Sequence, residues 1–287
     1  DVDWTYDYHI MMNEFRRHPK IGGWLYTEHH DVINEWNGYY RYDRSDKITG
    51  LDSLAPGMSL TDLHSPFYIS TGDQLCRDVK PGEAVVVPLF ASFLTDRNPG
   101  KRLVLRSELY GWDALGQRES YLQASQPIAF EPWMAKELPA MKLNMPKKPA
   151  LVVLALSLEN EAGVVLQRNF TTFLVANGLP PRAENLKSAG GDLRVVRFAP
   201  NTFKDAKWSQ KQWNVLDGLK VNGAGHGYFE YRVAWPEGLD AKKLAGASFL
   251  MEASAKQLFG KDRDGAKVGE GDFMRGKGTH DPSELPN

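Results

Sequence analysis

The strongest constraint on the fold is a change in the period of the hydrophobic pattern near residue 51. Before that point, residues 4–17 carry large apolar side chains at helical spacing, which places four of them on one face: Trp4, Tyr8, Met11 and Phe15. Asp3 is suited to cap this helix and Pro19 to end it. Beyond residue 51, apolar and polar residues alternate as they do in half-buried strands. The chain therefore combines a short helical start with a long β-rich remainder.

A short apolar run at residues 21–27 follows the expected helix and is preceded by a turn signal. A helix followed directly by a buried strand is typical of parallel α/β folds. We therefore expect residues 1–50 to contain one helix and one strand of such a sheet.

Two all-β units are expected downstream. Strands separated by Pro/Gly turns occupy residues 64–177 and include a hairpin formed by residues 150–158 and 164–175. A linker expected at residues 178–182 precedes further candidate strands at residues 193–198, 228–235 and 248–259. The pattern predicts an Ig-like sandwich and then a jelly-roll-like unit, with domain boundaries of 1–50, 51–178 and 179–287.

Composition excludes several classes of protein. The formal net charge is −1, whereas a nucleic-acid surface needs clustered basic residues, so we expect no nucleic-acid partner. The sequence has no run of 18 apolar residues, and we expect no membrane partner. Cys76 is the only cysteine, so it cannot form an internal disulfide. The compartment stays open, with a periplasmic or extracellular location favoured. Because the chain opens with Asp1 and not Met, we expect its true start to lie upstream.

A dense polar and aromatic patch follows the expected strand. It consists of Tyr26, Thr27, Glu28, His29, His30 and Asp31, and Trp36 and Asn37 lie close enough in sequence to join it. Ligands of parallel α/β folds collect at the C-terminal ends of the strands. This place in the fold makes the patch a candidate binding site.

Three hypotheses compete for this patch: a metal site, a polar loop without a ligand, and the rim of a sugar-binding pocket. Adjacent histidines on an extended chain point to opposite sides, and the spacing fits no usual zinc pattern. We therefore expect no metal and no other cofactor. An aromatic floor with carboxylate and amide hydrogen bonds to hydroxyl groups would suit a sugar.

Four motifs occur in a fixed order within residues 13–47. They are Asn13-Glu14-Phe15-Arg16-Arg17, Tyr26-Thr27-Glu28 with Asp31, Glu35-Trp36-Asn37-Gly38, and Asp43-Arg44-Ser45-Asp46-Lys47. Together they resemble the end of the (β/α)8 barrel in family 2 glycoside hydrolases, the group that includes β-galactosidases and β-glucuronidases. The later sequence is similar to the accessory β modules of such enzymes, and residues 213–235 and 249–259 resemble a galactose-binding-like jelly roll.

The resemblance implies a retaining mechanism with two catalytic glutamates whose carboxyl groups lie about 5–5.5 Å apart. In the family these glutamates follow the fourth and seventh barrel strands, whereas this chain is expected to hold only the eighth. No catalytic residue is therefore expected within it.

The resemblance also implies roles in substrate binding. Tyr26 best matches the aromatic floor under the sugar, and Trp24 is the second match. Glu28 would orient the substrate or a neighbouring catalytic group, and Trp36 and Asn37 would form part of the wall. The Asn-x-Lys motif with which β-glucuronidases hold a sugar carboxylate is absent, and residues 35–38 bring an acidic side chain instead. Because that charge would repel a uronate, a neutral sugar such as galactose is favoured.

The sequence thus predicts a mainly β chain in which the final β/α unit of a barrel precedes two β-sandwiches. It would be the C-terminal part of a retaining glycosidase acting on β-glycosides of neutral sugars, inactive alone. Its partners would be the carbohydrate substrate and the remaining N-terminal part of the barrel. The alternative is a non-catalytic carbohydrate-binding or scaffold protein. In the second unit, four aromatic residues could contact sugars, although core packing is favoured for each: Trp208, Trp213, Tyr228 and Trp235.

Overall fold

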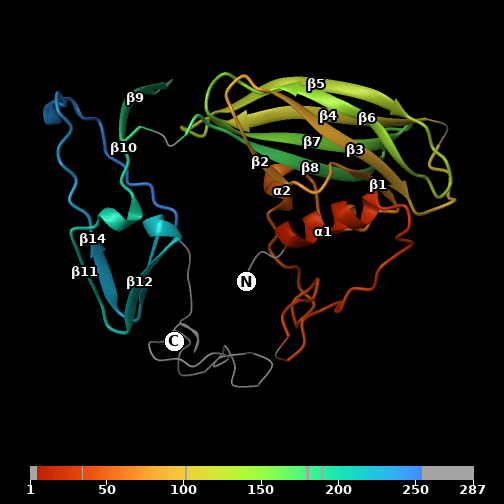
Figure 1. Cartoon of the computed structure of the whole chain (residues 1–287), viewed down its shortest axis with the longest axis horizontal. Coiled ribbons are helices and arrows are strands. Elements are labelled where there is room, and N and C mark those ends of the chain that lie inside the picture. Colours follow the sequence, from red (N-terminus) through yellow and green to blue (C-terminus); the bar gives the residue numbers. More distant parts are fainter. Residues whose placement is uncertain (1–4, 34, 101, 179–180, 189, 254–287) are drawn as a thin grey trace. The chain divides into compact units, whose positions relative to one another are not determined.

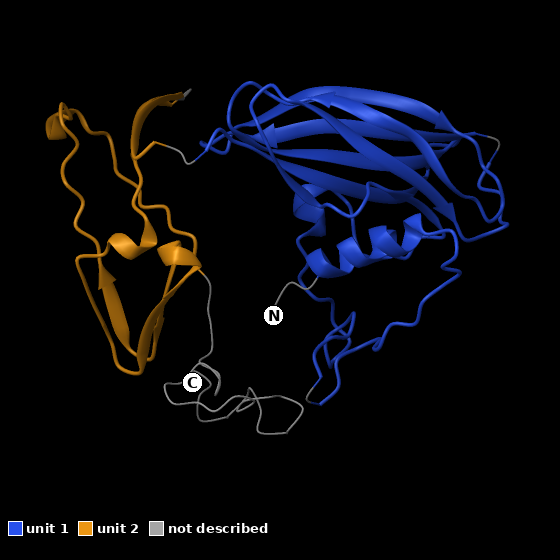
Figure 2. Ribbon diagram, viewed as in Figure 1, with its two compact units in different colours: residues 1–180 blue, residues 181–287 orange. Residues whose placement is uncertain are grey.

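The computed structural model describes residues 5–33, 35–100, 102–178, 181–188 and 190–253. It divides the chain into two compact units, Asp1–Pro180 and Pro181–Asn287 (Figure 2). Strands far outnumber helices, which confirms the predicted mainly β class. The described strands form open sheets, and none of these sheets closes into a barrel. No helix within the described ranges has the length and apolar character needed to span a bilayer.

The first unit contains short helices and two sheets. The helices are α1 (Thr5–Arg17), α2 (Leu51–Leu54) and α3 (Leu60–Leu63). The strands are β1 (Phe67–Ser70), β2 (Cys76–Val79), β3 (Ala84–Phe93), β4 (Leu103–Trp112), β5 (Arg118–Ile128), β6 (Ala135–Asn144), β7 (Ala150–Asn160) and β8 (Val165–Val175).

The two sheets of this unit have the strand orders β1-β3-β6 and β2-β8-β7-β4-β5 (Figure 1). Neighbouring strands are antiparallel, except that β2 runs parallel to β8. The expected hairpin of residues 150–158 and 164–175 is confirmed as β7 and β8. One hydrophobic core joins the two sheets, since it contains Leu89 of β3, Leu105 of β4 and Leu154 of β7, each at most 2% exposed.

Strand β3 shows how the sequence pattern produces this core. Its residues alternate between buried and exposed, so that Val85, Val87 and Leu89 face inward. Pro88 lies at a β-bulge between Val87 and Leu89, where the register to β6 shifts. Proline lacks an amide hydrogen, and a bulge is one of the few places in a central strand that tolerates this.

A second hydrophobic cluster lies on the outer face of the five-stranded sheet. Val153 of β7 points into it, while its neighbours Val152 and Leu154 point into the first core. Tyr8 and Met12 of α1 pack here, together with residues from α2 and α3. The three short helices therefore cover a sheet face that would otherwise expose apolar side chains to water.

Helix α1 is confirmed, but its most buried face differs from the expected one. The sequence placed Tyr8, Met11 and Phe15 on an apolar face with Trp4, which lies outside the described residues. In the structure Met11 and Phe15 are only half-buried. The fully buried positions include three polar residues at i, i+4 and i+7 spacing: His9, Asn13 and Arg16.

These polar side chains are buried because the sheets supply hydrogen-bond partners. Asn13 Oδ1 accepts hydrogen bonds from Tyr68 Oη at 3.0 Å and Asn169 Nδ2 at 2.9 Å. Arg16 donates to Ser92 Oγ at 3.1 Å and to the Ser92 carbonyl at 2.7 Å. Buried polar groups cost little when they are hydrogen-bonded. Helix α1 is thus fixed to β1, β3 and β8 by a polar network as well as by apolar contacts.

The strand expected at residues 21–27 is not formed, which corrects the sequence prediction. These residues belong to no strand, and the Leu25 side chain is 94% exposed. A parallel strand is stabilised by neighbours on both sides and by helices on both faces. The part of the chain that the structure describes offers this segment no neighbouring strand.

The described residues of the second unit form three antiparallel strand pairs. These are β9 (Ala183–Ser188) with β10 (Gly191–Val196), β11 (Asp205–Trp208) with β14 (Gly227–Glu230), and β12 (Lys211–Val215) with β13 (Lys220–Ala224). Single 3₁₀ turns occur at η1 (Pro200–Thr202) and η3 (Ala241–Lys243), whereas η2 (Leu216–Gly218) is a short turn whose residues have positive φ values.

Two of the strands expected in this unit differ from the strands in the structure. The strand expected at residues 228–235 is shorter and ends at Glu230. Residues 248–253 form no strand, and the rest of the candidate at 248–259 lies outside the described residues. The jelly-roll architecture therefore stays a prediction.

Glycines allow the Trp208 indole to lie against the strands of this unit. A Cβ atom at Gly223 or Gly227 would overlap the Trp208 ring. Residues 225 and 226 connect β13 to β14. Trp208 is consequently a packing residue, whereas Tyr228 and Trp235 are 47% and 57% exposed.

Candidate functional site

The sequence-predicted site lies in a segment that packs on α1 through aromatic rings. We call Tyr8, Trp24, Tyr26, Tyr39 and His64 the ring cluster. The Tyr26 and Tyr39 rings stack, with centroids 4.4 Å apart and an interplanar angle of 20°. Tyr8 meets the Tyr26 ring edge-on at 5.0 Å, and Tyr39 meets His64 edge-on at 4.9 Å. Such arrangements stabilise aromatic pairs beyond their burial alone.

Hydrogen bonds connect three members of the ring cluster through one hydroxyl group. Tyr8 Oη lies 2.8 Å from Tyr39 Oη and 3.1 Å from His64 Nε2. Burial raises the pKa of Tyr8 and of Tyr39. Burial, assisted by the charge of Arg16, lowers the pKa of His64. All three side chains are therefore uncharged at neutral pH, and the cluster offers a neutral aromatic surface.

Tyr26 and Asn37, both predicted to contact substrate, are brought together. The Tyr26 hydroxyl donates to the Asn37 carbonyl oxygen, and Asn37 Nδ2 donates to the Thr27 carbonyl oxygen at 2.8 Å. These contacts hold an exposed amide beside a half-buried aromatic ring. Trp24, also half-buried, belongs to the same cluster and lies 6.3 Å from the His64 ring.

Glu28 follows directly in sequence and is half-buried. Its backbone carbonyl accepts a hydrogen bond from the Tyr39 amide at 3.3 Å. Its side-chain Oε1 atom is buried and has no hydrogen-bond partner among the described residues. A buried carboxylate oxygen without a donor is unfavourable.

A buried ion pair braces the loop that carries Trp36 and Asn37. Lys47 Nζ lies 2.7 Å from Asp31 Oδ1, and the two side chains are only 7% and 11% exposed. The same lysine donates to the Trp36 carbonyl at 2.9 Å, and Asp31 Oδ1 also accepts from the Gly38 amide at 3.0 Å. The Trp36 ring itself is 65% exposed.

Sequence reasoning missed the part that Tyr8 and His64 play. Tyr8 was identified only as an apolar helix residue, and His64 was only the first residue of the strand-rich region expected at residues 64–177. No local signal marks His64, because its partners are 25 to 56 positions away in the chain. Only the folding of α1 and α3 onto the same sheet face brings these rings together.

The histidines of the patch do not converge on one point. The His29 and His30 ring centroids are 6.2 Å apart with an interplanar angle of 77°, and His29 is exposed. Within the described ranges, no group of three or more His, Cys, Asp or Glu residues is arranged to hold a metal ion.

Comparison with known proteins identifies no family. No family model matches the chain, and no curated protein matches it. Several solved structures align with parts of the chain. A cycloisomaltooligosaccharide glucanotransferase from Paenibacillus sp. aligns over 38% of this chain and 13% of its own length, with 13% identity and a TM-score of 0.25.

Two other structures are comparably distant. The sporulation control protein Spo0M from Bacillus subtilis aligns over 35% of this chain and 45% of its own length, with 10% identity and a TM-score of 0.25. A protein assigned as a β-galactosidase from Bacteroides fragilis aligns over 51% of this chain and 21% of its own length, with 17% identity and a TM-score of 0.27. The chain thus spans less than half the length of each, and similarity this low supports no assignment.

Proposed function

We propose that this chain is part of a retaining β-glycosidase of the family 2 type that acts on neutral sugars. In this proposal the ring cluster, Glu28 and Asn37 form one wall of the sugar-binding site. The two catalytic carboxylates come from a segment that this sequence does not contain. The Ig-like and jelly-roll-like β units support the barrel.

The observation that carries the proposal is the stacked pair of Tyr26 and Tyr39 beside Glu28 and Asn37. Aromatic faces pack against the C–H faces of sugars, and carboxylate and amide groups bind their hydroxyls. The described structure combines these groups within one short segment. Glu28 belongs to the same segment, and its buried Oε1 atom has no partner among the described residues.

The preference for a neutral sugar rests on charge. Lys47 is already paired with Asp31 in a nearly buried contact, so its charge is compensated. Glu35 is exposed in the same loop and would repel a carboxylate. A galactoside or another uncharged β-glycoside suits these surroundings better than a uronide.

The partly exposed segment at residues 21–27 supports the proposed partner. Leu25 is 94% exposed, although the run is apolar enough to be expected in a buried strand. Strand neighbours from an upstream barrel segment would cover it and satisfy its backbone groups. This chain alone would therefore bind sugar weakly and would not hydrolyse it.

The test compares the chain alone with the chain joined to its upstream coding sequence, using a panel of nitrophenyl β-glycosides. Activity is expected only in the longer protein, with the galactoside hydrolysed faster than the glucuronide. Within that protein, Tyr26→Ala should lower kcat/KM about tenfold or more, since each 1.4 kcal/mol of lost transition-state binding is about tenfold.

Tyr42→Ala is the matched control, because Tyr42 is a 62% exposed aromatic residue of the same segment outside the ring cluster. It should leave kcat/KM nearly unchanged. Sugar binding with no hydrolysis in either protein would overturn the proposal in favour of a non-catalytic carbohydrate-binding or scaffold protein. An equal loss from both substitutions would remove the role given to Tyr26.

A further inference from the structure

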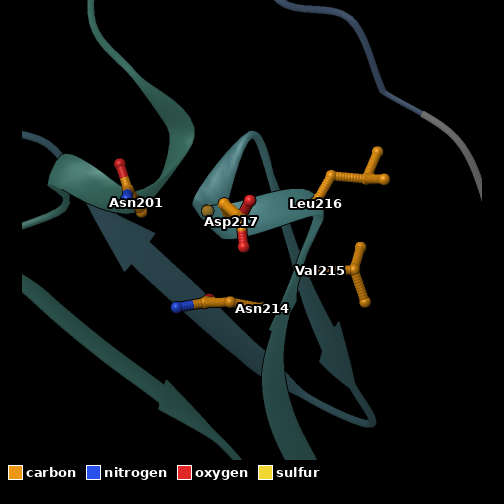
Figure 3. A pocket seen from close by; sticks show the side chains of 6 residues that line it. Asn201, Asn214, Val215, Leu216 and Asp217 are labelled. Atoms are coloured by element: carbon orange, nitrogen blue, oxygen red, sulfur yellow. The ribbon is translucent and has the colours of Figure 1, made fainter.

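The second unit contains a polar pocket unrelated to the ring cluster. Its volume is about 450 Å³, and it is lined by Asn201, Asn214, Val215, Leu216, Asp217 and Gly218. In Figure 3 the Asn201, Asn214 and Asp217 side chains lie on one side of the view, while the Val215 and Leu216 side chains point to the other side. The polar groups of the pocket thus gather on one side of it.

The three polar side chains make no hydrogen bond or ion pair with other described residues. Asn201 comes from η1, Asn214 from β12 and Asp217 from η2, so three separate elements bring them to one place. Two amides and one carboxylate supply both donors and acceptors. Vicinal hydroxyl groups, which donate and accept at neighbouring positions, match such a set.

The backbone that positions Asp217 is unusual. Leu216, Asp217 and Gly218 have φ values of 52°, 52° and 89°, which form one left-handed turn closed by a hydrogen bond from the Leu219 amide to the Leu216 carbonyl at 2.9 Å. A left-handed conformation is unfavourable for residues with a side chain, and most of all for a bulky one such as leucine. Conformations of this kind persist where the surrounding structure requires them and concentrate at binding sites.

Gly218 lies directly against one of the polar side chains of the pocket. A Cβ atom at this position would overlap the Asn201 side-chain amide, so that amide lies directly against the Gly218 backbone. The close approach fixes Asn201 beside the left-handed turn. A side chain at position 218 would displace it.

We infer that this pocket is a second carbohydrate site that binds the vicinal hydroxyls of a neutral saccharide through Asn201, Asn214 and Asp217. A saccharide fits better than a metal cation. A hard cation such as Ca²⁺ takes six to eight oxygen ligands, often from several carboxylates, and this pocket has one carboxylate. The inference does not depend on the proposed glycosidase activity, because its residues lie in the other unit.

The test titrates the full 287-residue chain with galactose, lactose and cellobiose, and follows the side-chain amide signals of Asn201 and Asn214 by NMR. Saturable shifts of both signals are expected with at least one of these sugars. Asp217→Gly should weaken binding about tenfold or more while raising the thermal midpoint, since glycine adopts a positive φ without strain.

Two further variants distinguish an effect on sugar binding from an effect on the stability of the fold. Leu216→Gly relieves the same turn but keeps all three polar groups, so it should raise the thermal midpoint and retain sugar binding. Asp192→Ala removes an exposed carboxylate of β10 outside the pocket and should change neither property. The inference is overturned if none of the sugars shifts the asparagine signals. Equal affinity of Asp217→Gly and the parent chain, or shifts with Ca²⁺ alone, would overturn it too.

Discussion

His9 Nε2 lies 2.5 Å from Asn169 Oδ1, and this contact ties α1 to β8 across 160 positions of sequence. Both side chains are completely buried. This buried hydrogen bond therefore fixes the position of α1, which carries Tyr8 of the ring cluster, relative to the sheet.

The stability of the chain should decrease in mild acid because of His9. Burial lowers the pKa of His9 to about 4, and the hydrogen bond to Asn169 opposes this only in part. The unfolded chain binds the proton near its ordinary pKa of about 6.5. The buried neutral imidazole therefore makes its full contribution to the free energy of unfolding above pH 6.5. This contribution is lost as the pH falls towards 4. The loss is on the order of 3 kcal/mol.

Urea unfolding over this pH range measures the effect, with His9→Gln as the comparison. Glutamine can donate to Asn169 but does not titrate, so the variant should lose less stability on acidification. The His9→Gln variant should still lose some stability on acidification, because burial also lowers the pKa of His64. If the variant and the parent lose the same stability, His9 is not the titrating group.

Arg16→Lys should destabilise the chain by about 2 kcal/mol, since it removes hydrogen bonds from a charged group to buried acceptors. Arg16 is 3% exposed and donates to the Ser92 hydroxyl and carbonyl and to the Pro66 carbonyl. A lysine ammonium cannot reproduce this planar set of donors. The free energy of unfolding in urea is the measurement.

Arg17→Lys is the control for this change. The Arg17 side chain is 39% exposed and pairs with Glu14 on the helix surface. Exposed pairs contribute little, so a change of less than about 0.5 kcal/mol is expected. Comparable losses for the two substitutions would mean that the network around Arg16 does not anchor α1.

Lys47→Met should loosen the loop that carries Trp36 and Asn37. It leaves the Asp31 carboxylate nearly buried without its cation and removes the donor to the Trp36 carbonyl. Breaking a buried pair on one side typically costs about 3–5 kcal/mol. Hydrogen exchange at the Gly38 amide, which donates to Asp31, should accelerate. Lys20→Met changes an exposed lysine and should leave this exchange rate unchanged.

Gly38→Ala should disrupt the site, whereas Gly22→Ala should not. A Cβ atom at Gly38 would overlap the backbone of His30 and Asp31, and backbone atoms cannot move aside cheaply. At Gly22 no atom lies within 4 Å of the added carbon. We expect Gly38→Ala to expose the Tyr26 ring, as seen by faster hydrogen exchange and proteolysis between residues 28 and 47. Unchanged protection in this variant would contradict the observed approach of the two loop segments.

Parts of the architecture could be predicted because they depend on local patterns. The alternation in β3 and the Asn160 turn between β7 and β8 are short-range features, and the structure contains both. The helix at Thr5–Arg17 follows from spacing alone. The grouping of Tyr26 with Asn37 was also expected, since the two residues are close in sequence.

What only the tertiary structure decided are the contacts between distant segments. Spacing on α1 favoured Met11 and Phe15 for burial, yet the buried face holds His9, Asn13 and Arg16, because β1, β3 and β8 supply their hydrogen-bond partners. The sequence also marked residues 21–27 as a strand from their apolar character. A strand, however, is defined by its neighbours, and the described chain gives this segment none. The spacing of hydrophobic residues can be read directly from the sequence. The hydrogen-bond partners of buried polar groups and of strand edges, in contrast, come together only when the chain folds.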